Sequence, residues 1–144
     1  MADLTPSRKG AIAEAAIVHE CVKLGLEVLR PFGEGRRYDL VIDTGDRLLR
    51  AQVKWARYRA GVITIEARTC RHTPGGYVRT TYGADEIDGF AVYCDYTREC
   101  FWLPIVDFEG QGHISLRLSP ARNNQSGSIR WAAHYPFRGC SSAG

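Results

Sequence analysis

Two polar side chains that could take part in a reaction share one face of a strand-like segment. Over residues 50–55 the side chains alternate between the two faces of an extended strand, so Gln52 and Lys54 lie on the same face. Asp39 belongs to the preceding strand-like segment, and the turn at 43–46 brings it beside the first half of this strand. Hairpin geometry alone therefore predicts that one acid, one amide and one lysine lie close together.

This set of groups suits the hydrolysis of a phosphodiester bond. A carboxylate such as Asp39 can hold Mg²⁺, which keeps several waters and accepts phosphate oxygens. The metal activates a water molecule and offsets the charge of the transition state. A lysine beside it can orient that water or stabilise the developing negative charge. An ordinary amphipathic hairpin with a solvated Lys54 explains the same short motif, and the residues alone leave both interpretations open.

The charge of the chain is unevenly distributed. The formal net charge is +3, yet the segment 30–79 carries eleven Lys or Arg against five Asp or Glu. From residue 85 to residue 109 the balance reverses, with seven acids against Arg98 alone. Most of the basic residues are Arg, which suits contacts with phosphates and base edges. A solvated basic surface and a phosphate-binding face are both compatible with this pattern.

The first helix is predicted from its end signals and its periodicity. Thr5 and Pro6 are typical of an N-cap and a first helical residue, and Gly25 of the position after the helix end. Glu14 is predicted on a flank of this helix, together with Val18 and Cys21. The main apolar stripe is predicted at Ile12, Ala15, Ala16, His19 and Val22.

The remaining pattern predicts an α/β domain with a mixed sheet. Strands are expected at 26–29, 37–42, 48–56, 62–67, 90–94, 101–106 and 114–118. The strand at 62–67 is expected to pack next to the central hairpin, and residues 72–83 are expected to form a loop. Trp131, Tyr135 and Phe137 are expected to dock the C-terminal part onto the body. We therefore expect a single domain over residues 1–138 and a flexible tail over 139–144.

Several classes of protein are excluded by the composition. No apolar run approaches the length of a membrane-spanning helix, and no apolar stretch follows the basic pair near the N-terminus as in a secretory signal. Five cysteines without a CxxC pair are typical of buried thiols in a reducing compartment. We expect a cytoplasmic protein that makes no membrane contact.

Three short segments resemble a known family. The segments 10–14, 38–42 and 52–54 resemble the active-site elements of PD-(D/E)XK nucleases. More narrowly, they are similar to the branch that includes group I intron-encoded homing endonucleases, in which Gln replaces the second acid. The resemblance continues through 82–93 and reaches 123–131, so it covers most of residues 9–135.

This resemblance implies a restriction-endonuclease-like core, a mixed β-sheet flanked by helices, and a role for each site residue. Asp39 would be the central metal ligand, joined by the backbone carbonyl of Val53. Glu14 would reach the metal from the first helix, directly or through water, and Lys54 would be the catalytic lysine. Gln52 would supply an amide oxygen, which can ligate a hard cation such as Mg²⁺ but brings no charge.

The activity that the resemblance implies is site-specific, Mg²⁺-dependent cleavage of double-stranded DNA. Because one chain carries one active site and a duplex has two strands, we expect a homo-oligomer, a dimer or a tetramer. A Holliday-junction resolvase of the same fold and a DNA-binding module with a decayed site are the alternatives. The expected DNA contacts follow the catalytic strand and the next one: Arg57, Arg59, Arg68, Arg71, Arg79, Thr80 and Thr81.

Overall fold

The first helix, α1 (Pro6–Lys23), has the ends that its sequence predicts. The Thr5 side chain accepts a hydrogen bond from the Arg8 backbone N–H at 3.2 Å, which satisfies one of the unpaired donors of the first turn. Gly25 follows the helix end with φ 77°, a left-handed conformation that glycine adopts without strain. The computed structural model describes residues 3–120 and 129–141, apart from the side chains of residues 70–72.

The packed face of α1 differs from the predicted stripe. Ala13, Ile17 and Cys21, spaced four residues apart, are buried against the central sheet, whereas Val22 of the predicted stripe is 67% exposed. Two stripes of similar spacing run along this helix, and spacing alone cannot decide between them. The small Ala13 and Cys21 let the helix approach the sheet closely. Glu14 is half-buried at the border of the packed face.

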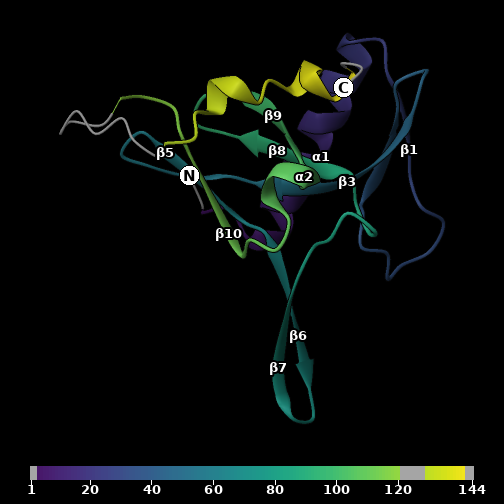
Figure 1. Cartoon of the computed structure of the whole chain (residues 1–144), viewed down its shortest axis with the longest axis vertical. Coiled ribbons are helices and arrows are strands. Elements are labelled where there is room, and N and C mark those ends of the chain that lie inside the picture. The colour runs from purple at the N-terminus through teal and green to yellow at the C-terminus, as the bar shows by residue number, and fades with distance from the viewer. Residues whose placement is uncertain (1–2, 121–128, 142–144) are drawn as a thin grey trace.

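A mixed five-stranded sheet forms the centre of the molecule, as predicted (Figure 1). Its strands, in spatial order, are β1 (Glu27–Leu29), β2 (Leu40–Asp43), β3 (Leu48–Trp55), β8 (Gly89–Cys94) and β9 (Glu99–Pro104). The β2–β3 hairpin is antiparallel and closes through the predicted turn, where the Asp43 side chain accepts from the Gly45 N–H at 2.8 Å. β3 and β8 are parallel and every other neighbour pair is antiparallel.

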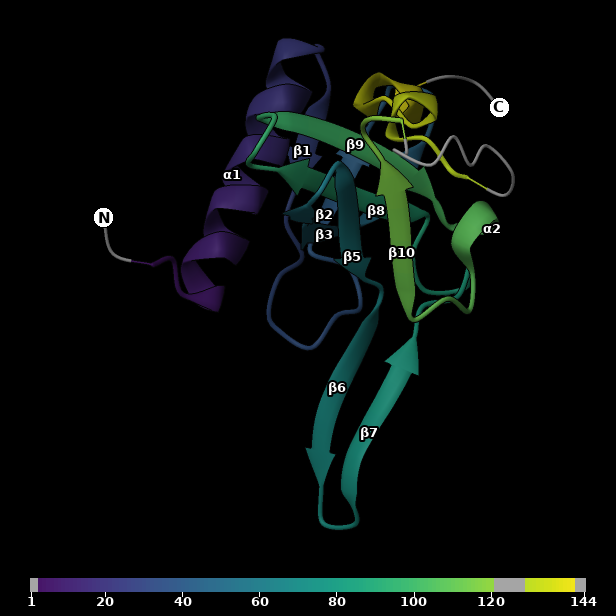
Figure 2. The same ribbon diagram turned by 90° about the vertical axis from the view of Figure 1, so that its left-hand side faces the viewer.

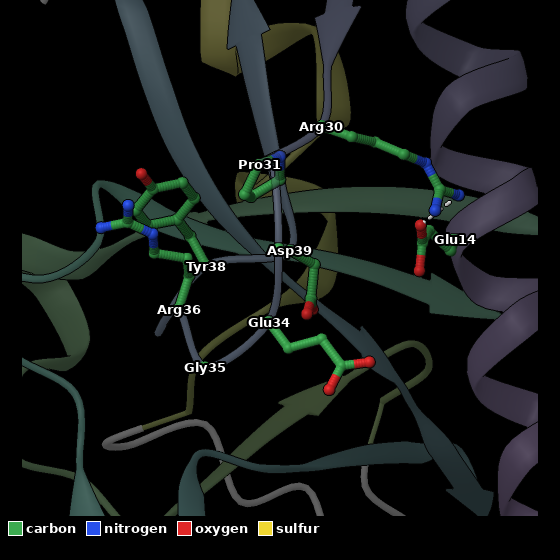
Figure 3. A pocket seen from close by; sticks show the side chains of 9 residues that line it. Glu14, Arg30, Pro31, Glu34, Gly35, Arg36, Tyr38 and Asp39 are labelled. Atoms are coloured by element: carbon green, nitrogen blue, oxygen red, sulfur yellow. Dashed lines mark ion pairs between the residues drawn. The ribbon is translucent and has the colours of Figure 1, made fainter.

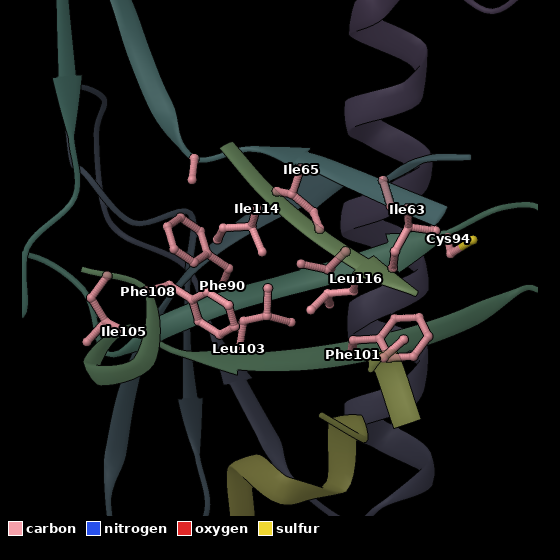
Figure 4. Packing of buried hydrophobic residues seen from close by; sticks show 14 of the residues in the cluster. Ile63, Ile65, Phe90, Cys94, Phe101, Leu103, Ile105, Phe108, Ile114 and Leu116 are labelled. Carbon is pink, nitrogen blue, oxygen red and sulfur yellow. The ribbon is translucent and has the colours of Figure 1, made fainter. Parts of the chain in front are cut away.

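A second sheet covers the face opposite α1 (Figure 2). It contains β10 (His113–Arg117), β5 (Val62–Glu66) and β4 (Arg57–Arg59), all antiparallel. The prediction that 62–67 lies next to the hairpin in the same sheet is wrong, because β8 occupies the position beside β3. The alternating Ile63 and Ile65 instead point into a core against Phe90 and Leu103 of the central sheet (Figure 4).

A two-stranded arm projects from the body between these two sheets (Figures 1 and 2). Its strands are β6 (Arg68–Thr73) and β7 (Gly76–Thr81), paired antiparallel along their whole length. The expectation of a loop over 72–83 is therefore wrong for most of that segment. Polar residues dominate the arm, so its sequence lacks the apolar alternation by which half-buried strands are detected.

The C-terminal part of the chain docks on the body through short elements. α2 (Ile105–Phe108) follows β9, and two 3₁₀ helices, η1 (Ala132–His134) and η2 (Phe137–Ser141), follow the segment that is not described. Phe137 and Cys140 are buried in the core beneath α1. The packed part of the chain thus extends to η2, beyond residue 139, where the tail was expected to begin. Among the described residues, no helix has the length and apolarity to cross a membrane.

Candidate active site

The edge of β3 becomes free of its partner strand at Ala51, and Asp39 occupies the position that follows. The β2–β3 ladder ends with Leu40 opposite Ala51. Beyond it, the Asp39 N–H donates to the Ala51 carbonyl at 2.9 Å, and the Val53 N–H donates to Asp39 Oδ2 at 2.9 Å. The carboxylate therefore continues the ladder in place of a backbone carbonyl, beside the residues that the hairpin geometry predicted.

The same edge directs a backbone carbonyl toward the acid. In a strand, the N–H and C=O of one residue point to the same side. Because the Val53 N–H points at Asp39, the Val53 carbonyl is directed to the same open edge. Arg50 shows the opposite direction: its N–H donates to Asp88 Oδ2 at 2.7 Å, and its carbonyl accepts from the Asp88 N–H at 2.8 Å, on the β8 side.

A cavity of about 300 Å³ brings Asp39 and Glu14 together (Figure 3). Glu14 approaches from α1, and Asp39 and Glu34 approach from the segment between β1 and β2. The Arg30 guanidinium forms an ion pair with Glu14 at 2.5 Å. The cavity is thus lined by three carboxylates, with a cation already paired to one of them.

Burial shifts the pKa of Asp39 and that of Lys54 in the direction that favours the neutral form of each group. Burial raises the pKa of Asp39, while the Val53 N–H and the charges of Lys54 and Arg30 act in the opposite direction. Burial lowers the pKa of Lys54, and the charge of Asp39 opposes that shift. The charge of each group therefore favours the charged form of the other. The Lys54 Nζ also lies 5.5 Å from the centre of the Tyr82 ring.

Gln52 lies on the same strand as Lys54. It lies between Ala51 and Val53 on β3, opposite Phe90 of the parallel strand β8, and its side chain is half-buried. Glu14 and Asp39 line the described cavity, whereas Gln52 does not. Its role at the metal stays a prediction.

Comparison with known proteins places the chain in a family. The family model described as PD-(D/E)XK endonuclease matches residues 4–138. The chain belongs to this family. The solved structure of a bacterial homing endonuclease, I-Ssp6803I, is similar with a TM-score of 0.74 and 26% sequence identity, over 92% of this chain and 88% of that chain. No curated protein sequence matches significantly. The expected restriction-endonuclease-like fold and the family resemblance are both confirmed, and the chain is a DNA endonuclease.

The donor set of this PD-(D/E)XK endonuclease fits a hard divalent cation. Asp39 has one carboxylate oxygen outside its hydrogen bond with Val53, Glu14 lines the same cavity, and the Val53 carbonyl is directed to the same edge. Oxygen donors of this kind suit Mg²⁺, which retains waters rather than requiring a complete cage of protein ligands. Although Glu14, Glu34 and Asp39 line one cavity, they do not form a preformed metal site: among the described residues, no group of three His, Cys, Asp or Glu side chains could hold a metal ion.

The predicted DNA-contact residues of the endonuclease fall on three strands, which are β4 of the second sheet and β6 and β7 of the arm. Arg57 and Arg59 are exposed on β4, and Arg79 and Thr80 are exposed on β7 of the arm. Arg68, at the root of β6, is engaged within the protein: its Nε donates to Glu66 at 2.8 Å and its Nη2 lies 3.2 Å from His113 Nε2.

Thr81 is half-buried at the root of β7. The side chain of Arg71 lies outside the described part of the structure.

Four residues around the site were not singled out from the sequence. Arg30 and Glu34 line the cavity, and Arg37 and Tyr82 lie between the arm and Lys54 of β3. Two glycines flank Glu34 in the segment from residue 33 to residue 35. The position of this segment directly before Asp39 was the signal that could have pointed to Glu34.

Proposed function

We propose that this endonuclease is a site-specific, metal-dependent enzyme of the homing type, which hydrolyses phosphodiester bonds of double-stranded DNA inside the cell. The observation that supports this proposal most is the position of Asp39 at the open edge of β3. There it accepts from the Val53 N–H at 2.9 Å and shares a cavity with Glu14. Lys54 lies in the same electrostatic field.

The proposed roles follow from chemistry and position. Mg²⁺ would be held by Asp39, Glu14, the Val53 carbonyl and the Gln52 amide, and when bound it supplies an activated water and charge neutralisation. Lys54, whose burial lowers its pKa, is placed to hold a proton near the attacking water or to stabilise charge on the phosphate oxygens. The Val53 N–H fixes the Asp39 carboxylate so that its remaining oxygen faces the cavity.

The arm supports recognition of a linear duplex. A two-stranded β-ribbon fits the major groove, where each base pair shows a distinct pattern of donors and acceptors. Arg79 and Thr80 lie exposed on this ribbon, and Arg57 and Arg59 lie exposed on β4 of the body. The arm would read bases while β4 contacts phosphates. The similar bacterial enzyme is a homing endonuclease by its description, which agrees with recognition of a defined site.

The decisive experiment compares substrates in the presence of Mg²⁺. We expect cleavage of a small subset of a random-sequence duplex library, and none of synthetic four-way junctions without that sequence. Cleavage of junctions regardless of sequence would instead identify a junction resolvase. No cleavage of either substrate would identify a DNA-binding module with a decayed site.

Two active-site variants serve as controls for contaminating nucleases. Asp39→Asn and Lys54→Ala should abolish cleavage and leave DNA binding largely intact, because affinity arises mostly from dispersed arginine contacts. Equal loss of binding and cleavage in a filter-binding assay would contradict the assignment of these residues.

A further inference from the structure

Arg37 contacts both strands of the arm at its root. Its Nη1 donates to Thr69 Oγ1 on β6 at 2.7 Å, and its Nη2 donates to the Thr81 carbonyl on β7 at 2.7 Å. These residues belong to the first pairs of the arm, since Arg68 lies opposite Thr81 and Thr69 opposite Thr80. One guanidinium group therefore spans the two strands where they leave the body.

The same guanidinium is fixed from two further sides. Its Nε forms an ion pair with Glu86 Oε2 at 2.7 Å that lacks hydrogen-bond geometry, and its Nη2 donates to Glu86 Oε1 at 3.5 Å. Glu86 in turn accepts from the Gly83 N–H at 3.3 Å. Its central carbon lies 4.0 Å from the centre of the Tyr82 ring, and Tyr82 is only 2% exposed. A planar guanidinium with several donors in a rigid fork suits this arrangement, whereas a lysine could not reproduce it.

This contact network borders directly on the catalytic residues. Arg37 stands two positions before Asp39 in the chain, and the ring on which it lies is also 5.5 Å from Lys54 Nζ. Tyr82 therefore lies between the root of the arm and the catalytic lysine. We define Arg37 and Tyr82, with Thr69, Thr81 and Glu86 around them, as the arm joint.

The arm joint lies at the base of an element that has little support of its own. An isolated two-stranded hairpin is marginally stable in water, and the arm projects without covering elements (Figure 2). The contacts at its root must therefore set its direction relative to the body. A misplacement of the order of 1 Å at reacting groups costs about a hundredfold in rate, so the direction of a DNA-bound arm determines whether the phosphate meets Asp39 and Lys54 correctly.

We propose that Arg37 is a positioning residue that couples engagement of DNA by the arm to cleavage at Asp39 and Lys54. The proposal rests on the proposed function, in which the arm binds the target duplex. Arg37 acts through the arm and through Tyr82, and it makes no contact with the DNA itself. Its loss should therefore impair cleavage in the bound complex more than it impairs binding.

The test separates binding from cleavage in variants of the arm joint. Arg37→Gln removes the charge and the fork, and Thr69→Val removes one acceptor at nearly constant volume. DNA affinity is measured with Ca²⁺ in place of Mg²⁺, and the cleavage rate of the bound complex is measured under single turnover. We expect Arg37→Gln to slow cleavage about a hundredfold with a Kd close to that of the wild type. Thr69→Val should slow it by a smaller factor, and Thr69→Ser, which retains the hydroxyl, should restore it.

Two comparisons make the result specific. Because both residues act through one contact, the double variant Arg37→Gln/Thr69→Val should be no slower than Arg37→Gln alone. Arg138→Gln, which removes an exposed arginine on η2, is the matched control and should leave both quantities unchanged. Parallel losses of affinity and rate in Arg37→Gln would overturn the proposal by making Arg37 a DNA contact. Unchanged rates, or losses that multiply in the double variant, would overturn it as well.

Hydrogen exchange of the free protein distinguishes failure of this proposal from failure of the proposed function. Arg37→Gln and Thr69→Val should speed exchange of backbone amides at the root of β6 and β7 without DNA or metal. If the wild type neither binds nor cuts duplex DNA, the proposed function fails, whatever the exchange shows. If the wild type cuts DNA and exchange at the root is the same in all variants, the arm joint does not fix the arm and the proposal alone fails.

Discussion

At the scale of single residues, two requirements on Asp39 oppose each other. As the proposed metal ligand it must be ionised to hold a cation, yet burial raises its pKa. The Val53 N–H and the cations Lys54 and Arg30 offset that effect only in part. A bound divalent cation would offset the rest, since it favours the ionised carboxylate strongly. Ionisation of Asp39 and metal binding should therefore depend on each other.

This linkage predicts the pH dependence of metal affinity. Protons and Mg²⁺ compete for the Asp39 carboxylate, so a raised pKa makes the competition begin at higher pH than it would for an ordinary aspartate. We expect Mg²⁺ affinity, measured by calorimetry without DNA, to be constant at neutral pH and to fall as the pH is lowered through the raised pKa of Asp39. Asp39→Asn should bind weakly with no such pH dependence. Affinity that stays constant down to the ordinary aspartate range would contradict this linkage.

Gln52 permits a second test at the same scale. If its amide oxygen faces the metal, Gln52→Glu places a carboxylate there, and hard cations favour carboxylate oxygens. Cleavage by Gln52→Glu should persist at saturating Mg²⁺, whereas Gln52→Leu, which deletes the oxygen and keeps the strand, should lose activity. The measurement is a Mg²⁺ titration of the cleavage rate for the wild type and both variants. Full activity in Gln52→Leu would show that this residue has only a strand role.

At the scale of secondary-structure elements, local signals in the sequence predicted the first helix and the central hairpin. They did not predict which strands pair when those strands are far apart in the chain. The ends of α1 and the β2–β3 hairpin follow from caps, turn residues and alternation within a few positions. The parallel pairing of β3 with β8 joins segments nearly forty residues apart in the chain, and no local pattern encodes it. As a consequence β5 was expected in the wrong sheet, although its alternation of buried residues was recognised.

The arm shows why some elements escape detection altogether. The β6–β7 pair projects from the body and its residues are mostly polar, so neither strand carries an apolar stripe in the sequence. Its stability depends on cross-strand pairing and on the arm joint, where Arg37 supplies contacts from another part of the chain. A sequence pattern predicts a strand through burial on one face, and that signal is absent here. The residues that we propose set its direction, Arg37 and Tyr82, lie outside the arm.

The difference between two arginines of the arm provides a test at this scale. Arg79 is exposed on β7, whereas Arg68 is engaged with Glu66 and His113. If the arm contacts DNA, Arg79→Ala should lower the salt slope of binding by about one unit for a lost phosphate contact, or cost about 1–3 kcal/mol at one base position. Arg68→Ala should change neither quantity as strongly. Binding titrations over a range of salt concentrations measure both, and an unchanged Arg79→Ala would place the DNA on another face.

At the scale of the whole molecule, the two faces of the central sheet are covered by different layers. α1 covers one face and brings Glu14 to the edge where Asp39 lies, while the second sheet covers the other face and carries β4 (Figure 2). Arg57 and Arg59 of β4 and the arm belong to the basic segment of the sequence. The uneven charge of the chain thus corresponds to particular elements, which composition alone did not indicate.

One active site per chain leads to a prediction about assembly. The two strands of a duplex run antiparallel, so two copies related by a two-fold axis can present one site to each strand. We therefore expect a dimer or a dimer of dimers, detectable as a multiple of the chain mass by sedimentation.

Wild-type protein should convert a plasmid carrying the target mainly to the linear form. Hybrid oligomers, made by unfolding and refolding the wild type together with inactive Asp39→Asn, should cut one strand and accumulate nicked circles. Wild-type protein refolded alone and diluted to the same active concentration is the control. A mixture that gives the same ratio of nicked to linear product as this control would show that each chain cuts independently, and the two-fold arrangement would be rejected.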